Sequence, residues 1–275
     1  MSQRAKEILD AYEKNERFLN SNFLDAIPWD EVHKHDIDES FLPILIYMRD
    51  VEAFTDMYYQ QMMQSPTGKD PVIRRFMDRW QHEELLHAEL LNRFLEELGY
   101  PTDSKWYEKA CNDIPNTYKL KQFLTKLITQ SCGKRFSAVH MTWGAINELS
   151  TLQGYRRLWE QANHPVLEHI LKGIAREESS HIFFYHSIAR LKLEESKQTQ
   201  RLARFMVETF WSPVGQGTKP RKEVDYVVQQ LFSGEYGLQA IRQNVNGSLQ
   251  KLPGFEGTTK IIDRIEEVIF PKKAL

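Results

Sequence analysis

The chain has 275 residues and a formal net charge of −2, and these values already exclude several classes of protein. Because 36 Lys and Arg are interspersed with 38 Asp and Glu, we expect no overall basic field that would recruit nucleic acid or an anionic membrane surface. The longest apolar run, residues 41–48, is far shorter than the roughly 20 residues that span a bilayer, so no transmembrane segment is expected. Two cysteines without a CxxC motif, and an N-terminus without a secretory signal, predict a cytoplasmic protein with no disulfide framework.

The sequence is poor in helix breakers, and its apolar residues recur at helical spacing almost throughout. Gly (13) and Pro (11) are both scarce, and no stretch shows sustained alternation of apolar and polar residues. The chain is therefore predicted to be all-α. In chain order, the expected helices cover residues 3–19, 40–64, 70–98, 117–131, 134–162, 165–193, 196–210, 221–232, 235–249 and 257–268.

Four of these helices have lengths suited to a four-helix bundle, namely 40–64, 70–98, 134–162 and 165–193. The joins after the first and after the third are short, so the helices of each pair are expected to be antiparallel neighbours. The stretch 99–133 between the pairs is long, as a bundle with one crossover connection requires. Helices 3–19, 117–131 and those within 196–268 are expected to flank the bundle, and a single domain is predicted over residues 1–275.

One chemical pattern occurs on two of the long helices. Residues 83–87 and 177–181 both read Glu-Glu-x-x-His, a pattern expected only about 0.07 times by chance in a chain of this composition. A carboxylate and an imidazole three residues apart lie on one helix face and can bind one metal ion. A single copy is more often an exposed acid near a half-buried histidine, but two copies on apolar faces predict a metal site, because buried carboxylates need compensating cations. The predicted ligands are Glu84, His87, Glu178 and His181.

A dinuclear site in a bundle also needs one carboxylate from each of the other two long helices. Glu148 lies in the middle of the third long helix, on a stripe of apolar and small residues, and we predict it as a ligand. On the first long helix Asp50, Glu52 and Asp56 compete, and we favour Glu52 because it lies near the helix centre. Four carboxylates and two imidazoles suit iron or manganese better than zinc, which prefers nitrogen and sulfur ligands in a tetrahedron.

These residues resemble the ferritin-like di-iron oxygenases and, among them, the soluble acyl-carrier-protein desaturases. The resemblance covers residues 40–193 and is most specific in two places: the segment Arg79-Trp80-x-x-Glu83-Glu84-x-x-His87-Ala88-x-x-Leu91-x-x-Phe94-Leu95, and Glu148-x-x-Thr151. It implies a ferritin-like bundle with two iron ions, dioxygen as co-substrate, and desaturation of a fatty acyl chain bound to an acyl carrier protein. It further implies a ferredoxin-like electron donor and a homodimer.

The resemblance also implies a catalytic role for Thr151, which would assist proton delivery during oxygen activation. The alternative is a helical threonine whose hydroxyl bonds the carbonyl four residues earlier. Other chemistries remain open, because the same six ligands serve N-oxygenases, hydroxylases and aldehyde-deformylating enzymes. An iron-storage protein is a further alternative, which the additional helices after residue 193 disfavour.

Several residues around the ligands carry more specific hypotheses. Glu83 and Glu177 each precede a predicted ligand, and each is expected either to reach across to the histidine of the opposite helix or to be a solvated carboxylate. Trp80 could donate its indole N–H to a carboxylate, although a plain core position is the more common role of such a tryptophan. Gly144 indicates either space for oxygen and substrate or close helix packing.

Two further groups of residues bear on the substrate and its carrier. An apolar stripe would suit an acyl chain, but such a stripe is more often plain core; it comprises Tyr47, Met48, Met141, Leu149, Phe183 and Phe184. Because a carrier protein of this kind is acidic, basic pairs are candidate docking positions, with an ordinary solvated face as the usual alternative. These pairs lie at residues 74–75, 134–135, 156–157 and 219–222.

Overall fold

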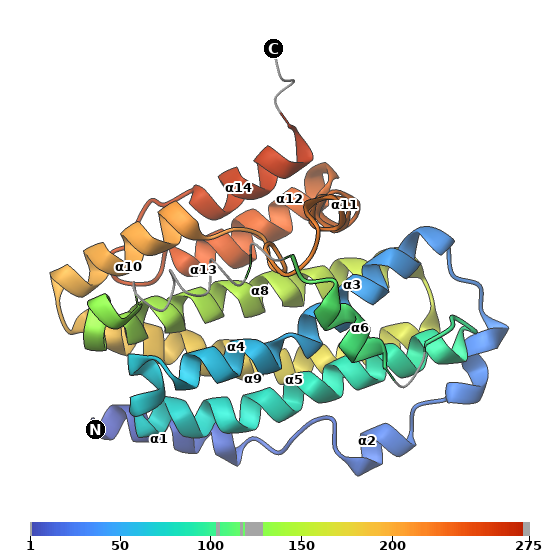
Figure 1. Ribbon diagram of the computed structural model, residues 1–275, viewed down its shortest axis with the longest axis horizontal. Helices are drawn as coiled ribbons and strands as arrows, with labels where there is room; N and C mark the ends of the chain where they lie inside the picture. Colours follow the sequence, from blue (N-terminus) through green and yellow to red (C-terminus); the bar gives the residue numbers. More distant parts are fainter. Residues whose placement is uncertain (1, 103–104, 116–117, 119–128, 272–275) are drawn as a thin grey trace.

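The computed structural model describes residues 2–102, 105–115, 118 and 129–271 and confirms the all-α fold. Within these residues every named element is helical (Figure 1). The four arms of the bundle comprise the paired helices α3 (Leu42–Ala53) and α4 (Thr55–Met63), then α5 (Pro71–Glu97), α8 (Phe136–Ala162) and α9 (Pro165–Glu194).

The bundle helices begin where the sequence supplies start signals. α5 and α9 each have proline in the first turn, where a missing N–H costs nothing. The side chain of Asp70 accepts from the Val72 N–H, and that of His164 accepts from the Leu167 N–H, so both ends are capped. α3 packs along α5, and α8 packs along α9, as the short joins predicted. The long connection between the two pairs contains α6 (Trp106–Asn112), which was not predicted, and most of the predicted helix 117–131 lies outside the described residues.

The prediction of a continuous helix over 40–64 is wrong at one point, since α3 ends at Ala53 and α4 begins at Thr55. The Thr55 hydroxyl donates to the carbonyl of Glu52 at 2.5 Å, so a side chain competes with the backbone ladder at this point. The interruption lies directly after the predicted ligand Glu52. The predicted helix 3–19 is also too long, because α1 (Gln3–Lys14) ends before an irregular stretch that leads to α2 (Ser21–Asp25).

The C-terminal part forms a second layer over α8 and α3 (Figure 1). The predicted helices 196–210 and 221–232 are confirmed as α10 (Lys197–Phe210) and α11 (Arg221–Phe232). The predicted helix 235–249 is divided into α12 (Gly234–Ala240), a π-helical turn (Ile241–Asn246) and α13 (Gly247–Leu249), and the last helix, α14 (Lys260–Ile269), begins later than predicted. α1 lies on the opposite side of the bundle, against α9 and α5. One hydrophobic core runs from Leu9 in α1 to Ile265 in α14, so both flanking parts are packed onto the bundle.

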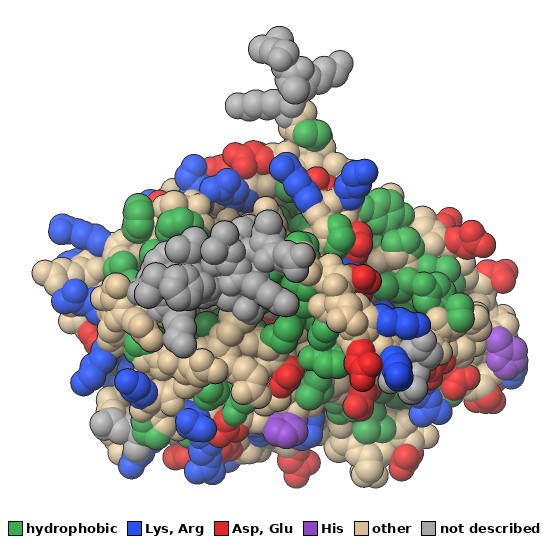
Figure 2. Space-filling model, in the orientation of Figure 1, with side chains coloured by type: hydrophobic (Ala, Val, Ile, Leu, Met, Phe, Trp, Pro, Cys, Tyr) green, Lys and Arg blue, Asp and Glu red, His purple; other side chains and the backbone are tan. Residues whose placement is uncertain are grey.

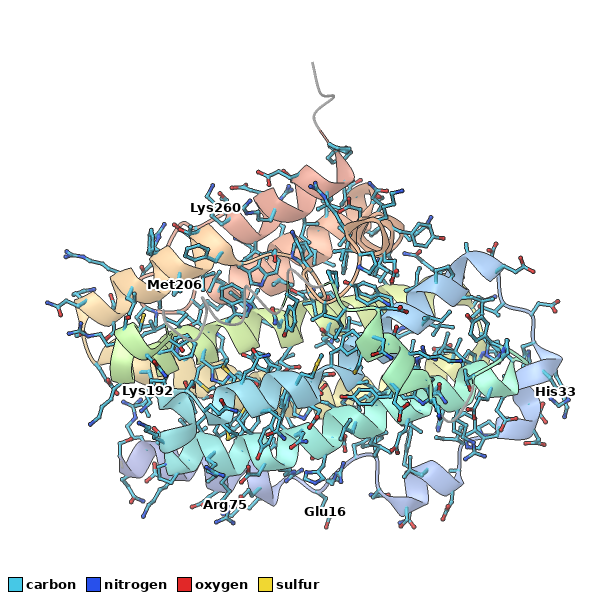
Figure 3. All side chains as sticks on the ribbon, in the orientation of Figure 1. Glu16, His33, Arg75, Lys192, Met206 and Lys260 are labelled. Carbon is cyan, nitrogen blue, oxygen red and sulfur yellow. The ribbon has the colours of Figure 1, made fainter. Side chains whose placement is uncertain are left out.

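Charges of both signs are interspersed on the face shown in Figure 2, as the balanced composition predicts. The exposed residues Glu16, Arg75 and Lys260 lie at the outer edge, while side chains fill the space between the helices (Figure 3). Within the described part of the chain, no helix is both long enough and apolar enough to cross a membrane.

Candidate metal centre

Every arm of the bundle contributes to one cluster of acids and histidines. α3 supplies Glu52, α8 supplies Glu148, and α5 and α9 each supply a Glu-x-x-His pair. All six residues are buried, and none is more than 6 % exposed. The six residues predicted as metal ligands, Glu52, Glu84, His87, Glu148, Glu178 and His181, are therefore brought together in the interior.

The donor atoms of the cluster form two overlapping groups. In each group one ligand atom from each of four residues lies within 4.8 Å of the others, a spread that one cation could bridge. Glu84 and Glu178 belong to both groups, so they lie between the two positions. The first group is Glu52, Glu84, His87 and Glu178, and the second is Glu84, Glu148, Glu178 and His181.

Each imidazole points one ring nitrogen at three carboxylates. His87 Nδ1 lies 3.4 Å from Glu178 Oε1, 3.7 Å from Glu84 Oε2 and 3.9 Å from Glu52 Oε2. This is the environment of a ligand nitrogen rather than of a histidine held by one hydrogen bond.

The second histidine repeats the arrangement on the other side. His181 Nδ1 lies 3.0 Å from Glu84 Oε1, 3.3 Å from Glu178 Oε2 and 3.9 Å from Glu148 Oε2. The two motifs therefore produce two equivalent ring positions related by the shared carboxylates.

Three buried atoms at the centre make no hydrogen bond of acceptable geometry: Glu84 Oε1, His87 Nδ1 and Glu178 Oε1. Buried polar atoms are almost always paired, and leaving one unpaired costs about 1–3 kcal/mol. All three atoms belong to the shared carboxylates or to a facing imidazole. The donors therefore fit a pair of metal ions, which would occupy all of these lone pairs.

The electrostatics of the cluster point the same way. Burial raises the pKa of Glu52 well above its usual range, and the charge of Glu84 raises it further. Burial likewise raises the pKa of Glu148, to which the charges of Glu178 and Glu84 add. Four carboxylates this close cannot all be ionised without a positive charge between them, and divalent cations would supply it.

An outer pair of carboxylates orients the two histidines. Glu83 Oε2 lies 2.9 Å from His181 Nε2, and Glu177 Oε2 lies 3.2 Å from His87 Nε2. The hypothesis that each reaches across to the opposite helix is confirmed, and the alternative of solvated carboxylates is wrong, since Glu83 is 1 % and Glu177 4 % exposed. A proton held on Nε2 leaves the Nδ1 lone pair free to bind a metal.

Two aromatic residues each donate a hydrogen bond to one of the two ligand carboxylates that belong to a single group. The Trp80 indole N–H donates to Glu148 Oε1 at 3.0 Å, so this tryptophan does more than fill the core. The Tyr155 hydroxyl donates to Glu52 Oε1, a contact not expected from the sequence. Tyr155 is fully buried and lies two turns after Glu148 on α8, a spacing that places both on one helix face but does not reveal the partner.

Gly144 is explained by close packing. A Cβ at this position would lie 2.2 Å from the ring of Tyr185, so the space beside the glycine is filled by that aromatic side chain of α9. The alternative, that Gly144 opens room for oxygen and substrate, is therefore wrong.

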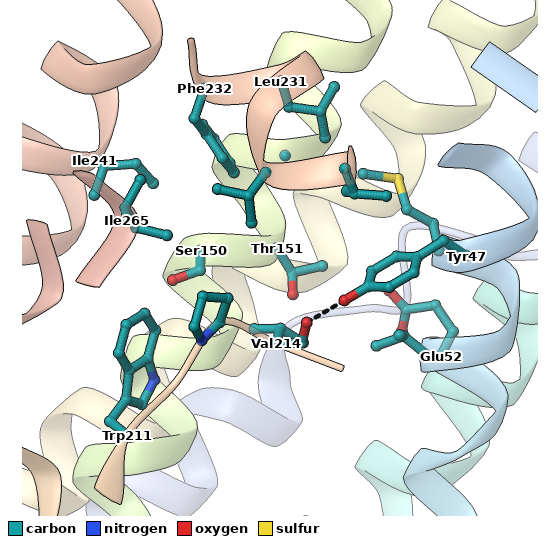
Figure 4. Close-up of a pocket in the computed structure, with 16 residues that line it drawn as sticks. Tyr47, Glu52, Ser150, Thr151, Trp211, Val214, Leu231, Phe232, Ile241 and Ile265 are labelled. Atoms are coloured by element: carbon teal, nitrogen blue, oxygen red, sulfur yellow. Dashed lines mark hydrogen bonds between the residues drawn. The ribbon is translucent and has the colours of Figure 1, made fainter. Parts of the chain in front are cut away.

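A narrow apolar cavity of about 60 Å³ lies between the bundle and the C-terminal layer (Figure 4). Glu52 and the predicted catalytic residue Thr151 both line it, so one end borders the metal cluster. Ile241 and Ile265 line it from the C-terminal layer. Of the apolar stripe predicted to suit an acyl chain, Tyr47 and Met48 line this cavity. Met141 and Phe184 are buried in the core, and Phe183 is 41 % exposed.

The segment after α10 closes one side of the cavity. The Tyr47 hydroxyl donates to the Val214 carbonyl, as Figure 4 shows. Gly215 has φ of +86°, and a Cβ there would lie 2.2 Å from the Tyr47 hydroxyl, so both its conformation and its surroundings require glycine. Lys219 is tied down by Asp50 and Glu223, both at 2.8 Å, which makes it part of this closure rather than of an exposed basic patch.

Comparison with family models, with curated proteins and with solved structures finds no match for this chain.

Proposed function

We propose that this protein is an oxygen-dependent di-iron oxidoreductase that desaturates a fatty acyl chain carried on an acyl carrier protein. The observation that carries the proposal is the pair of four-donor groups that share Glu84 and Glu178. Two shared carboxylates, one further carboxylate per position and one imidazole per position form the donor set expected of a dinuclear carboxylate centre in a helical bundle.

The donor set favours iron or manganese over zinc, and iron is the metal that we propose for the redox chemistry. Each position offers oxygen donors and a single imidazole, whereas zinc sites are usually tetrahedral with more nitrogen or sulfur. Bound iron would supply electron transfer to dioxygen, chemistry that no amino-acid side chain provides.

The chain's own residues would prepare the site for that chemistry. Glu83 and Glu177 fix the histidine rings, and the Trp80 indole orients Glu148. Burial of all six ligands excludes bulk water, which protects a reactive site from side reactions. The Thr151 hydroxyl, at the border of the cluster and the cavity, would hold and pass a proton.

The cavity supports an apolar substrate. Its lining is almost entirely apolar, and it extends from Glu52 and Thr151 towards Ile241 and Ile265. An alkyl chain in this space would have its methylene groups beside the metal positions. A storage protein has no use for such a cavity, so the enzyme is the better-supported interpretation.

The carrier protein, a ferredoxin-like electron donor, a homodimeric state and a cytoplasmic location complete the proposal. The first three rest on the resemblance of the two Glu-Glu-x-x-His segments and of Glu148-x-x-Thr151 to the soluble desaturases, and the location rests on the two cysteines without a CxxC motif.

Intact-mass measurement of a panel of acyl carrier proteins tests the proposal. The protein loaded with iron is incubated with each acyl carrier protein, dioxygen, and a ferredoxin with its reductase; protein without iron serves as the control. Desaturation lowers the acyl mass by about two units, and the chain length that reacts reports the reach of the cavity. A gain of about sixteen units would replace desaturation with hydroxylation, and a chain that binds no iron would refute the metal centre.

A further inference from the structure

The N-terminal segment of the chain reaches the outer carboxylates of the metal centre from outside the bundle. The Tyr12 hydroxyl donates to Glu83 Oε2 at 2.7 Å, across 71 positions of sequence. This oxygen is the same one that faces His181 Nε2 at 2.9 Å. A continuous path of hydrogen bonds therefore links Tyr12, through one carboxylate oxygen, to a predicted ligand.

The position of Tyr12 is fixed on all sides. Its side chain is fully buried, and its ring packs edge-on against Phe76 with centroids 5.0 Å apart. The Arg79 guanidinium lies 4.6 Å above the ring and donates to the other oxygen of Glu83 at 2.7 Å. Arg79 also donates to the carbonyl of Asn15, which ties the end of α1 to α5.

The N-terminal segment also contacts Glu177, the carboxylate that orients the other histidine, but with a backbone N–H instead of a phenol. The backbone N–H of Leu19 donates to Glu177 Oε1 at 3.1 Å, while the oxygen that faces His87 is Oε2. Leu19 packs onto α9 at Gly173, where a Cβ would lie 2.8 Å from the leucine side chain. Arg17 lies between the two carboxylates, with Nε 3.4 Å from Glu83 and 3.8 Å from Glu177.

The two metal positions therefore have the same kinds of ligand, but the carboxylates that orient their histidines make different contacts. Of the two carboxylates that orient the histidines, Glu83 alone receives a phenol from the described part of the chain, and it does so on the oxygen that orients His181. Partners of this kind set the orientation of a histidine ligand, and their loss typically weakens metal binding 10- to 100-fold.

We propose that Tyr12 is a positioning residue of the metal centre, which acts through Glu83 on His181 and makes the His181 position bind its metal more tightly than it would without the phenol. The two metal positions then respond unequally to loss of one hydroxyl group. This inference rests on the proposed dinuclear centre.

Anaerobic titration of the full-length, metal-free chain with Fe²⁺ tests the inference. Binding is followed by competition with a chromogenic chelator and by near-infrared circular dichroism of the bound Fe²⁺. Tyr12→Phe keeps the packed ring and removes the hydroxyl. We expect one of two equivalents to bind about 10-fold more weakly, with its dichroism bands shifted, while the other equivalent binds as in the wild type.

Tyr185→Phe is the matched control. Tyr185 is fully buried and packs against the same Phe76, but its hydroxyl donates to the sulfur of Met77 and not to a carboxylate. This variant is expected to bind both equivalents as the wild type does. Equal weakening of both equivalents by Tyr12→Phe, an unchanged titration, or the same loss in Tyr185→Phe would each overturn the inference. A wild-type chain that binds no Fe²⁺ would instead refute the dinuclear centre itself, and the inference with it.

Discussion

The two sides of the acid and histidine cluster are built differently. On the α5 and α9 side, Glu83 and Glu177 back the ligand histidines and are in turn held by the N-terminal segment. On the α3 and α8 side, Glu52 and Thr151 border an apolar cavity under the C-terminal layer. The first side is a dense network of hydrogen bonds, whereas on the second side each ligand carboxylate is held by one aromatic side chain beside a cavity with an almost entirely apolar lining. In the function proposed above, the N-terminal segment would support metal binding and the C-terminal layer would support substrate binding.

The largest expected effect comes from removing a carboxylate that both groups share. Glu178→Gln keeps the size of the side chain, removes the negative charge that both positions share and replaces one of its two oxygen donors with an NH₂ group, so we expect both ions to be lost. Iron content measured by plasma mass spectrometry checks this, with thermal unfolding to show that the chain is folded.

Glu168→Gln is the control for this change. Glu168 lies on the same helix, is exposed and pairs with Lys172, so its variant is expected to keep the full iron content. If Glu178→Gln kept both ions tightly bound, the Glu178 carboxylate would not be a ligand that the two positions share, as the geometry indicates.

Thr151→Val tests the side that faces the cavity. Valine has nearly the shape of threonine but carries no hydroxyl, so we expect iron content to be unchanged and turnover to fall about 100-fold, the size typical of a lost proton-transfer group. Ser150 provides a close control, because it lines the same cavity while its hydroxyl bonds the Ile146 carbonyl of its own helix. Ser150→Ala is expected to leave turnover unchanged, and equal losses in both variants would remove the special role of Thr151.

The sequence predicted the α5 and α9 side of the cluster better than the α3 and α8 side, which borders the cavity. A rare motif that occurs twice identifies Glu84, His87 and their counterparts. It also raised the contact of Glu83 and Glu177 with the opposite histidines as one of two alternatives, between which the structure decides. Tyr12 carries no such signal, because its contact with Glu83 depends on how α1 docks onto the finished bundle.

Local and tertiary effects explain the other differences. The interruption at Phe54 depends on one side-chain hydrogen bond from Thr55, which competes with a helix that the surrounding pattern favours. The role of Gly144 could not be decided from sequence, since helical spacing gives the face on which a residue lies but not the neighbour that fills it. The cavity likewise depends on the packing of α11 and α14 over α8, between elements about 70 to 110 residues apart, beyond the reach of any local pattern.

Two glycines of α8 allow a densely packed position to be compared with a position that lines the cavity. At Gly144 a Cβ would lie 2.2 Å from the ring of Tyr185, so Gly144→Ala is expected to destabilise the fold by about 1–3 kcal/mol through overpacking. At Gly154, which lines the cavity, a Cβ would lie 3.2 Å from the flexible end of Met48 and at ordinary contact distances, 3.8 and 3.9 Å, from Leu231 and Phe232. Gly154→Ala should therefore change stability by less than about 1 kcal/mol, since better helix propensity offsets the contact.

The effect of Gly154→Ala should lie in substrate binding instead. The added methyl narrows the cavity, so we expect KM to rise a few-fold for the longest acyl chain accepted and to change less for shorter ones, with iron content and kcat for short chains retained. Denaturant unfolding of both glycine variants, with KM across an acyl series for Gly154→Ala, measures the two effects separately. If KM rose equally for all chain lengths, the methyl would act on the centre rather than along the chain, and the cavity would not be the site that receives the substrate.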